Sequence, residues 1–397
     1  MGAVNRRMLL GMIAGAGLAG SAQAESVSLP FENGERPLVA YPQKRKLIRL
    51  TSRPPQLETP LSVFNESLIT PNDVFFVRYH LAGLPYDKID PDTFTVQIKG
   101  HVEKQVSLSL KQIKAMPSVE LTAVNQCSGN GRAFFTPRVP GGQAGNGLMG
   151  NAVWRGVPLK QLLDLAGVKA GAVEVKFQGM DGPVLEATPT FAKSLQIDHA
   201  RDGEVMLAYA MNGAEMPFLN GFPLRLIVPG YFGTYWVKHL NQITVLDAPL
   251  QNFWMATAYR IPDNDTASVP PGTAPTATRP IGKFSVRSFI TSHLDGAHVA
   301  ANREIVLRGI AFDSGTGIRN VEISRDNGTS WVPALLGEDH GRFAFRPWEA
   351  RLQLPPGTHH LVARATSHRG EQQPMEARWN PGGYMRNNVE STTIIAG

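Results

Sequence analysis

Hydrophobic and polar positions alternate with the two-residue period of a half-buried β-strand in two stretches, residues 93–99 and 173–177. Between them, residues 158–166 are leucine-rich, begin with a proline and are followed by Gly167, which predicts a short amphipathic helix. Two runs of continuous apolar residues predict buried strands, at residues 224–228 and 243–246. The region from about residue 61 to residue 246 is therefore expected to mix strands with short helices.

The two ends of the chain show different patterns. Residues 25–60 are rich in proline and predict irregular structure, and residues 263–280 are turn-rich with almost no large apolar side chain, which predicts a connector. Beyond the connector, short strand patterns follow at the spacing of a β-sandwich, at residues 304–311, 321–324, 330–334, 343–345, 351–354 and 361–366. We expect an α+β fold, with a mixed domain over residues 25–262 and an Ig-like sandwich over residues 281–397.

Residues 1–24 have the features of an export signal. Arg6 and Arg7 form a positive start, residues 8–18 an apolar stretch too short for an anchor, and residues 22–24 a small-x-small cleavage pattern. The paired arginines resemble a twin-arginine signal, which predicts export of the folded protein to the periplasm. No later segment has 18 consecutive apolar residues, so no membrane span is expected.

Composition narrows the function classes. Hydrophobic residues make up 42% of the 397 residues, enough for a sizeable core, and the 39 glycines and 30 prolines favour a loop-rich, mostly β architecture. The net charge is +6, but the one dense cationic run, residues 43–49, has no interleaved aromatic residues, so nucleic acid is not an expected partner. A single cysteine excludes an internal disulfide framework, a CxxCH haem site, an iron–sulfur cluster held within the chain and a cysteine-built zinc site.

That cysteine, Cys127, stands at the end of an alternating strand pattern and opens a loop of serine, glycine and asparagine, NQCSGNGR. An isolated cysteine is usually a small core residue, but the glycines allow a bulky ligand to approach and the export signal points to an oxidising compartment. Both features favour a metal-binding thiolate. One thiolate cannot complete a coordination sphere, so the other ligands would come with a cofactor.

Four segments in order resemble the sulfite oxidase family of mononuclear molybdenum enzymes. NQCSGNGR resembles the family's cysteine loop, FFVRYH (residues 75–80) its Phe-x-Arg-x-His segment, and FQGMD (residues 177–181) the strand end that brings an aspartate to the pterin. GFPLRLIVPGYFGTYWVKHL (residues 221–240) resembles its GFP-x-R…PG…VK-x-L stretch. The resemblance runs from about residue 65 to the C-terminus. It implies a molybdopterin-binding catalytic domain followed by a dimerisation sandwich.

The resemblance implies a role for each matching residue. Cys127 would bind molybdenum beside the two dithiolene sulfurs of the molybdopterin. The residues implied in cofactor binding are Phe76, Val77, Arg78, Tyr79, His80, Asp181, Asn220, Arg225, Trp236, Val237 and Lys238. Asn220 stands where animal members use a histidine.

Substrate capture would use positive charge at the metal. Arg78 and Arg132 match the family's anion-binding arginines, and Tyr259 matches its active-site tyrosine. The family's third arginine follows a Trp-Asn pair, but here residues 379–380 are followed by Pro-Gly-Gly. Arg386 is the candidate to replace it.

The implied activity is that of a periplasmic sulfite dehydrogenase, which oxidises sulfite to sulfate by oxygen-atom transfer. No haem is expected in this chain, so electrons would leave to a c-type cytochrome, and the sandwich would form a homodimer. Three alternatives stay open: a molybdopterin-dependent methionine sulfoxide reductase, which typically lacks the sandwich; a thiosulfate-oxidation molybdenum subunit acting on sulfane sulfur; and a secreted Ig-like binding module with an incidental cysteine.

Overall fold

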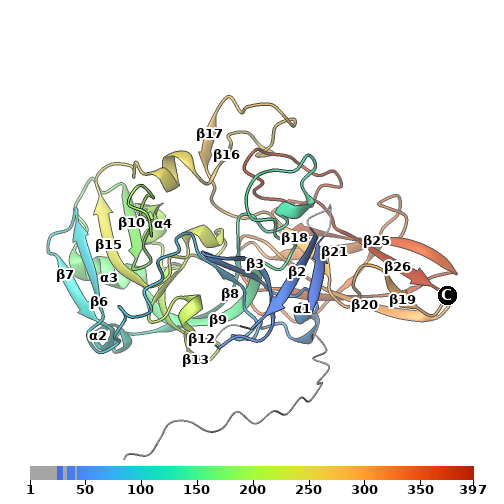
Figure 1. The fold of residues 1–397 in the computed structure, drawn as a ribbon, viewed down its shortest axis with the longest axis horizontal. Helices are drawn as coiled ribbons and strands as arrows, with labels where there is room; N and C mark the ends of the chain where they lie inside the picture. The colour runs from blue at the N-terminus through green and yellow to red at the C-terminus, as the bar shows by residue number, and fades with distance from the viewer. Residues whose placement is uncertain (1–24, 30–33, 41–42) are drawn as a thin grey trace, which may run out of the picture.

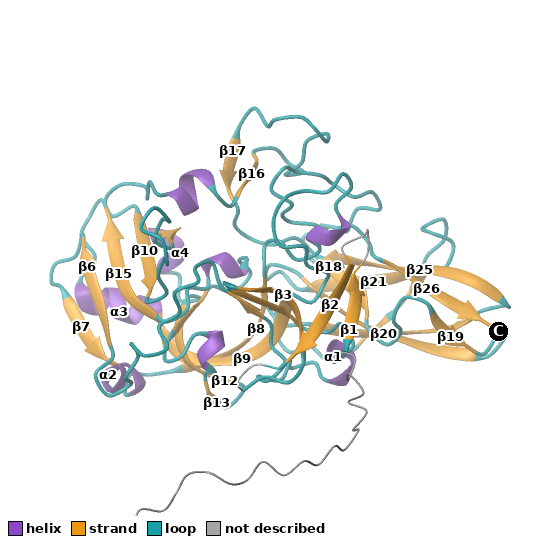
Figure 2. Cartoon of the chain, in the orientation of Figure 1, coloured by secondary structure: helices purple, strands orange, loops and turns teal. Residues whose placement is uncertain are grey.

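The computed structural model describes residues 25–29, 34–40 and 43–397, so the predicted export signal lies outside the described residues. Strands dominate, and the helices are short and lie at the edges of the sheets (Figures 1 and 2). The predicted α+β class is confirmed. Among the described residues, no helix is long and apolar enough to span a membrane.

Three sheets form the larger part of the molecule. The first has the order β1 (Ser26–Leu29), β2 (Gly34–Val39), β3 (Leu47–Ser52), β4 (Pro55–Glu58) and β5 (Val77–Arg78). The second has the order β11 (Ala192–Gln196), β10 (Glu174–Gly179), β15 (Leu240–Leu246), β6 (Thr95–Gly100) and β7 (Val106–Ser109). The third has the order β13 (Ala214–Glu215), β12 (Met206–Met211), β9 (Met149–Pro158) and β8 (Val119–Gln126), with β14 (Arg225–Ile227) pairing with β12.

Short helical segments connect these strands. The α-helices are α1 (Val63–Glu66), α2 (Leu110–Lys114), α3 (Leu159–Ala166) and α4 (Ile197–Ala200). Among the described residues there are also three 3₁₀-helices, η1 (Arg132–Phe134), η2 (Phe218–Asn220) and η3 (Gly233–Tyr235), and one π-helix, η4 (Phe253–Thr257). The helix predicted at residues 158–166 is α3, which buries the leucines at 159, 162 and 163 and ends before Gly167.

The C-terminal part is a two-sheet sandwich that projects away from the other sheets (Figure 1). One sheet has the order β18 (Arg287–Ile290), β20 (Glu304–Phe312), β24 (Arg346–Gln353) and β23 (Leu335–Leu336). The other has the order β19 (Ala297–Val299), β26 (Ser391–Ala396), β25 (Gly357–Ser367), β21 (Ile318–Ser324) and β22 (Val332–Pro333). Apolar side chains from both sheets bury one another in a core of their own.

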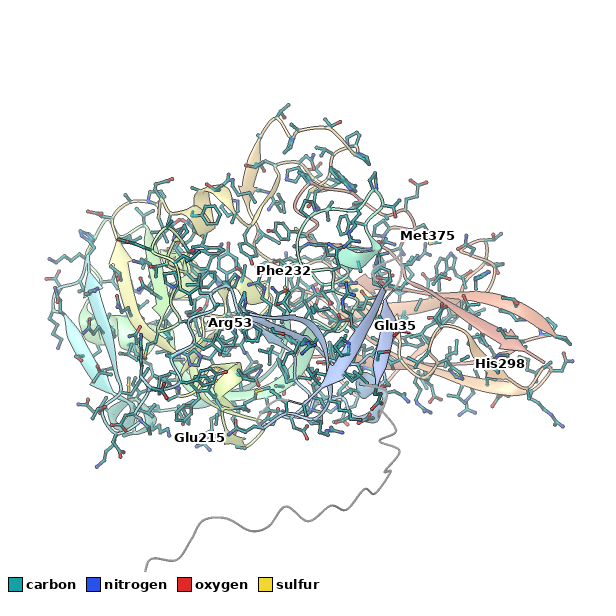
Figure 3. All side chains as sticks on the ribbon, viewed as in Figure 1. Glu35, Arg53, Glu215, Phe232, His298 and Met375 are labelled. Atoms are coloured by element: carbon teal, nitrogen blue, oxygen red, sulfur yellow. The ribbon has the colours of Figure 1, made fainter. Side chains whose placement is uncertain are left out.

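The main core fills the space between the second and third sheets and reaches the base of the sandwich. Side chains crowd this interior around Phe232, whereas His298 lies near the far end of the sandwich (Figure 3). The connector predicted at residues 263–280 ends in β17 (Thr278–Pro280), which pairs with β16 (Arg260–Pro262). Val269 also donates a hydrogen bond from its backbone to Trp379, so the connector is tied to the C-terminal loops.

Two predictions of local structure are wrong. Residues 25–60 form four strands rather than irregular structure; Pro55 is the first residue of β4, a position where a missing N–H is tolerated. The strand predicted at residues 343–345 is a turn that precedes β24, and the strand predicted at residues 351–354 is only the end of β24, which begins at Arg346.

Candidate active site

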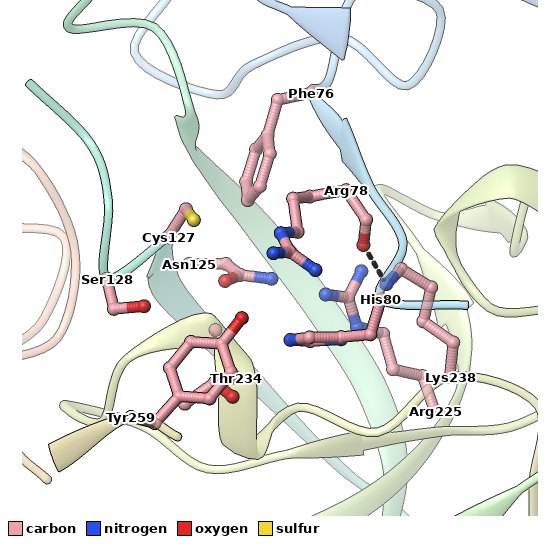
Figure 4. Close-up of a pocket in the computed structure, with 11 residues that line it drawn as sticks. Phe76, Arg78, His80, Asn125, Cys127, Ser128, Arg225, Thr234, Lys238 and Tyr259 are labelled. Carbon is pink, nitrogen blue, oxygen red and sulfur yellow. Dashed lines mark hydrogen bonds between the residues drawn. The ribbon is translucent and has the colours of Figure 1, made fainter. Parts of the chain in front are cut away.

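A pocket lies where β5, β8, β14 and η3 meet. Figure 4 shows the sulfur of Cys127 on one side and the side chains of Arg78 and His80 opposite it. The lining comes from six segments that are distant in the sequence: Phe76, Arg78 and His80; Asn125, Cys127 and Ser128; Arg225; Gly233 and Thr234; Lys238; and Tyr259.

Strand alternation at β5 decides which residues of the FFVRYH segment reach the pocket. Successive side chains of a strand point to opposite faces, so Phe76, Arg78 and His80 line the pocket. Val77 and Tyr79 are buried on the other face, in a separate apolar cluster. The structure therefore places three of these five predicted cofactor residues at the cavity and two behind it.

Cys127 follows β8 and begins a tight loop. Its backbone N–H donates to Leu148 (2.9 Å), and its carbonyl accepts from Asn130 (3.0 Å), so both backbone groups are fixed. A Cβ on Gly129 would lie 2.7 Å from the guanidinium of Arg132, so a larger residue here would displace that side chain. The loop thus presents one half-buried sulfur to the pocket on a rigid support.

The opposite wall comes from η3, which packs closely on β8. A Cβ on Gly233 would lie 2.4 Å from Oδ1 of Asn125, so only glycine allows this approach. Asn125 and Thr234 line the pocket, and both Asn125 amide atoms and the Thr234 hydroxyl are buried without a hydrogen-bond partner. Orphaned buried polar atoms are costly, so this wall is suited to a polar ligand.

Buried cations form the floor of the pocket. Arg225 lies between the rings of Trp154 and Trp236, 5.5 and 5.8 Å from their centroids, and burial lowers its pKa to about 9. Lys238 donates from Nζ to the carbonyl of Arg78 (2.5 Å, dashed in Figure 4). Burial, with help from the charge of Arg225, lowers the pKa of Lys238 to about 7. Burial makes the charged forms of these two side chains unfavourable, so a bound anion would stabilise them.

Aromatic groups close the other side. Tyr259 is buried in a left-handed backbone conformation (φ 56°), which is rare outside glycine and typical of functional sites. Burial raises the pKa of Tyr259, so its hydroxyl keeps its proton. His80 stacks on Phe191 (3.8 Å between centroids) and is neutral, because burial and then the charges of Arg78, Lys238 and Lys193 lower its pKa.

Comparison with known proteins gives one family along the chain. The family model "Oxidoreductase molybdopterin binding domain" matches residues 82–254, and "Mo-co oxidoreductase dimerisation domain" matches residues 278–395. Mitochondrial sulfite oxidase of Homo sapiens is 31% identical over 388 residues, covering 93% of this chain and 69% of the human protein. The chain belongs to the sulfite oxidase family.

Two further relatives agree with this assignment. Sulfite oxidase of Arabidopsis thaliana is 28% identical, covering 93% of this chain and 99% of the plant protein. The crystal structure of the sulfane dehydrogenase SoxCD from Paracoccus pantotrophus has a TM-score of 0.74 at 25% identity, covering 88% of this chain and 87% of that one. The family resemblance predicted from the four motifs is confirmed. The dimerisation domain also removes support from the methionine sulfoxide reductase alternative, and the molybdopterin domain removes it from the binding-module alternative.

The pocket fits the molybdopterin that the sulfite oxidase family implies. Its residues provide one sulfur at Cys127 and two buried cations, Arg225 and Lys238. Orphaned polar atoms add donors and acceptors: Nε2 of His80, Nε of Arg225, the amide of Asn125 and the hydroxyl of Thr234. A pterin with a phosphate presents matching anionic and polar groups.

The other predicted cofactor residues support the pocket from behind. Trp236 flanks Arg225, and Val237 is buried in the main core beside it. Asp181 is buried, and burial raises its pKa against the opposing charge of Lys238. Asn220 accepts from Lys44 (2.5 Å) and donates to the carbonyl of Phe76 (3.2 Å), so it fixes the wall without lining the cavity.

The two remaining predicted arginines lie outside the lining. Arg132 donates to the carbonyls of Gly142 (3.4 Å) and Gly382 (3.2 Å) and packs on the ring of Tyr384, at the rim of the pocket. Arg386 forms an ion pair with Glu390 and packs on a phenylalanine ring. Arg386 is therefore not among the residues that line the pocket, and its substitution for the third arginine stays a prediction.

Several site residues were missed in the sequence. Asn125 precedes Cys127 by two residues and so shares its face of β8, a spacing that could have identified it. Lys193 had no such signal: it is fully buried in β11, donates to the carbonyl of Trp254 (2.8 Å) and lies 5.3 Å from the ring centroid of Tyr259.

Proposed function

We propose that the protein is a periplasmic sulfite dehydrogenase, which oxidises sulfite to sulfate and passes the electrons to a c-type cytochrome. The observation that carries the proposal is the pairing of Arg78 with Cys127. The Arg78 guanidinium is partly buried, lines the same pocket as the sulfur and is close enough to hydrogen-bond to it. A fixed cation beside a metal-binding sulfur is the arrangement that an anionic sulfur substrate needs.

Cofactor binding is assigned to one part of the pocket. Cys127 would bind molybdenum, and Arg225 and Lys238 would hold the anionic end of the pterin. When bound, the molybdenum centre supplies oxygen-atom transfer to sulfur and takes up two electrons. An anion beside Lys238 would also raise its pKa from about 7, so binding would take up a proton near neutral pH.

Substrate binding is assigned to the other part. Arg78 would hold a sulfite oxygen, because a buried dianion requires charge-assisted hydrogen bonds. Tyr259 keeps its proton and so offers a neutral O–H donor at the same place. His80 is uncharged, so its ring orients neighbouring groups without adding charge.

The cellular setting follows from the two ends of the chain. Arg6, Arg7 and the 22–24 cleavage pattern support export through the twin-arginine pathway. The match of residues 278–395 to a dimerisation domain supports a homodimer with two-fold symmetry. No second redox group is expected in this chain, so a separate carrier would accept the electrons.

The test is sulfite-dependent reduction of cytochrome c by the purified, molybdenum-loaded enzyme. We expect turnover with sulfite and cytochrome c. Turnover with ferricyanide but not with cytochrome c would contradict the acceptor, and a loaded enzyme inert toward sulfite with both acceptors would contradict the activity.

A second candidate is oxidation of a sulfane sulfur. Residues 379–380 are followed by proline and glycines, and the charge of Arg386 is neutralised by Glu390, so the pocket holds fewer cations than three arginines would supply. Fewer cations suit a substrate with less negative charge, and the matching SoxCD structure is that of a sulfane dehydrogenase. Turnover with a persulfide-bearing carrier peptide and none with sulfite would favour this candidate.

A further inference from the structure

Tyr384, from the C-terminal part of the chain, stacks on Tyr259, one of the residues that line the pocket, and lies outside the lining itself. Its ring is parallel to that of Tyr259, with centroids 5.4 Å apart and an interplanar angle of 18°. Tyr259 is buried, whereas Tyr384 is only partly buried, so Tyr384 stands between the pocket and solvent. The guanidinium carbon of Arg132 lies 5.1 Å from the centroid of the same ring.

The loop that carries Tyr384 is fixed at several points. Asn380 donates from Nδ2 to the carbonyl of Tyr384 (2.8 Å), and its Oδ1 accepts from the Tyr384 N–H (3.1 Å). Met385 donates to the carbonyl of Ser128 (3.2 Å), which attaches this loop directly to the Cys127 loop. Gly383 has a positive φ of 59°, and a Cβ there would lie 2.9 Å from Nε of Arg132. The phenol is therefore held in place rather than being a mobile surface side chain.

We propose that Tyr384 is a specificity-determining residue whose hydroxyl donates a hydrogen bond to an oxyanion substrate held by Arg78 and Arg132. The inference rests on the proposed oxidation of a sulfur oxyanion and adds the residue that receives it. A phenol adds a hydrogen-bond donor without adding charge. The Tyr384 hydroxyl would therefore select substrates by their hydrogen-bonding oxygen atoms rather than by their total charge.

The electrostatics of the phenol agree with this role. Burial raises the pKa of Tyr384 and so does Cys127, while the charges of Arg132 and Arg78 and a hydrogen bond from the backbone of Tyr259 to the hydroxyl oxygen lower it. The hydroxyl thus lies within electrostatic reach of both arginines and the sulfur, and it stays protonated at neutral pH. A protonated hydroxyl is a donor, as the role requires.

The experiment compares Tyr384→Phe, which removes only the hydroxyl, with wild-type holoenzyme. Sulfite KM should rise about tenfold or more with kcat within about twofold, because a hydrogen bond to a charged group is worth a factor of about ten to a hundred. Sulfate, titrated calorimetrically as a non-reacting oxyanion, should bind more weakly by a similar factor. Tyr231→Phe is the matched control, since Tyr231 stacks on His199 away from the pocket and should leave both values unchanged.

The two readouts separate this inference from the proposed function. Sulfate binding weakened in Tyr384→Phe supports the inference even if wild-type enzyme does not oxidise sulfite, a result that would contradict only the proposed function. Sulfite KM and sulfate affinity both within twofold of wild type would overturn it. So would a fall in kcat with sulfate affinity unchanged, because that pattern indicates a purely structural role, or a wild-type holoenzyme that binds no sulfate.

Discussion

Two arginines of this protein are buried to the same degree in different surroundings. Arg225, on the pocket floor, is held by two tryptophan faces and by the carbonyl of Asn220 (2.9 Å) and forms no ion pair with any described residue. Arg287, at the base of the sandwich, is paired with Glu390 at 3.2 Å and also donates to Gln126 (3.1 Å). Burial lowers the pKa of both side chains, to about 9 and about 10.

This difference distinguishes the pocket, which is suited to binding a ligand, from the base of the sandwich, where the ion pairs stabilise the fold. At the sandwich base the carboxylate of Glu390 pairs with both Arg287 and Arg386, so a negative charge from within the chain contacts each arginine. In the pocket Arg225 has no ion-paired carboxylate among the described residues, and Lys238 feels the charge of one carboxyl only, Asp181, which does not form an ion pair with it and whose own pKa burial raises. Buried cations without anions are unstable unless a ligand supplies the negative charge. The pocket is thus built around an anion that the chain does not contain.

The largest effect should come from the sulfur of the pocket. Cys127→Ser should lower turnover by more than about 100-fold, since changing even an outer partner of a metal ligand costs about 10–100-fold. Serine is close to cysteine in size and the side chain is only half-buried, so the thermal unfolding temperature of the cofactor-free protein should change little. Sulfite oxidation retained above a few per cent would contradict the ligand assignment.

The next effect tests the sandwich side of the comparison. Glu390→Gln leaves Arg287 and Arg386 buried without a carboxylate, so the free energy of unfolding should fall by about 3–5 kcal/mol. Glu304→Gln breaks the exposed pair with Arg351 and should cost no more than about 1 kcal/mol. Equal losses in the two variants, measured by denaturant unfolding, would show that burial of the pair does not matter.

A charge change within the pocket should act on binding rather than on stability. Arg78→Gln should raise sulfite KM about ten- to a hundredfold, because a charge-assisted hydrogen bond contributes about 1.5–3 kcal/mol. Arg386→Gln removes an equally positive side chain that is paired with Glu390 outside the lining, and sulfite KM should change far less. If Arg386→Gln raised KM as much as Arg78→Gln, the placement of the substrate site would be wrong.

The last test concerns the dependence of the unfolding free energy on pH. Burial lowers the pKa of Lys44, Lys193 and Lys238 to about 7, so from pH 7 to about 10.5 the unfolded chain binds protons that the folded chain has lost. The unfolding free energy of cofactor-free protein should therefore rise with pH above 7, by up to about 1.4 kcal/mol per unit for each lysine. Burial raises the pKa of Glu58 from 4.5 to about 7. Between these two pH values the folded chain binds the extra proton, so this group lowers the unfolding free energy as the pH rises, but only below pH 7.

Lys238→Met sharpens this test. Removing the lysine from the pocket floor should reduce the slope of stability against pH, and it should also reduce cofactor content. Lys104→Met, an exposed change, should leave the slope intact. A slope in Lys238→Met equal to that of wild type would contradict the assignment of a lowered pKa to this group.

Local signals in the sequence were enough to predict some of the fold. Helix α3 follows from its leucine spacing, the proline before it and Gly167 after it, all within ten residues. Strands β1–β4 pair with one another as consecutive antiparallel neighbours, and they were missed because the prolines in the segment suggested loops. Burial of one strand by another is not visible in a single segment.

The candidate site was predicted where a motif and strand alternation agree. Arg78 and His80 share a face of β5 and reach the pocket, whereas Tyr79 between them turns to His239, at 2.7 Å from its hydroxyl. Lys193 and Tyr384 could not be predicted, because no motif surrounds them and tertiary packing alone brings them to Tyr259. Arg386 was assigned by distance along the chain, and its ion pair with Glu390, outside the pocket lining, could not be predicted from that distance.

The central claim is that the uncompensated cations around Cys127 hold an anionic molybdopterin. Molybdenum and pterin analysis of the protein, purified from cells that make the cofactor, tests it most directly. We predict about one molybdenum and one pterin per chain, with both strongly reduced in a double variant that replaces Arg225 and Lys238 by methionine. A folded wild-type chain without molybdenum, or a double variant that retains its full content, would contradict the account.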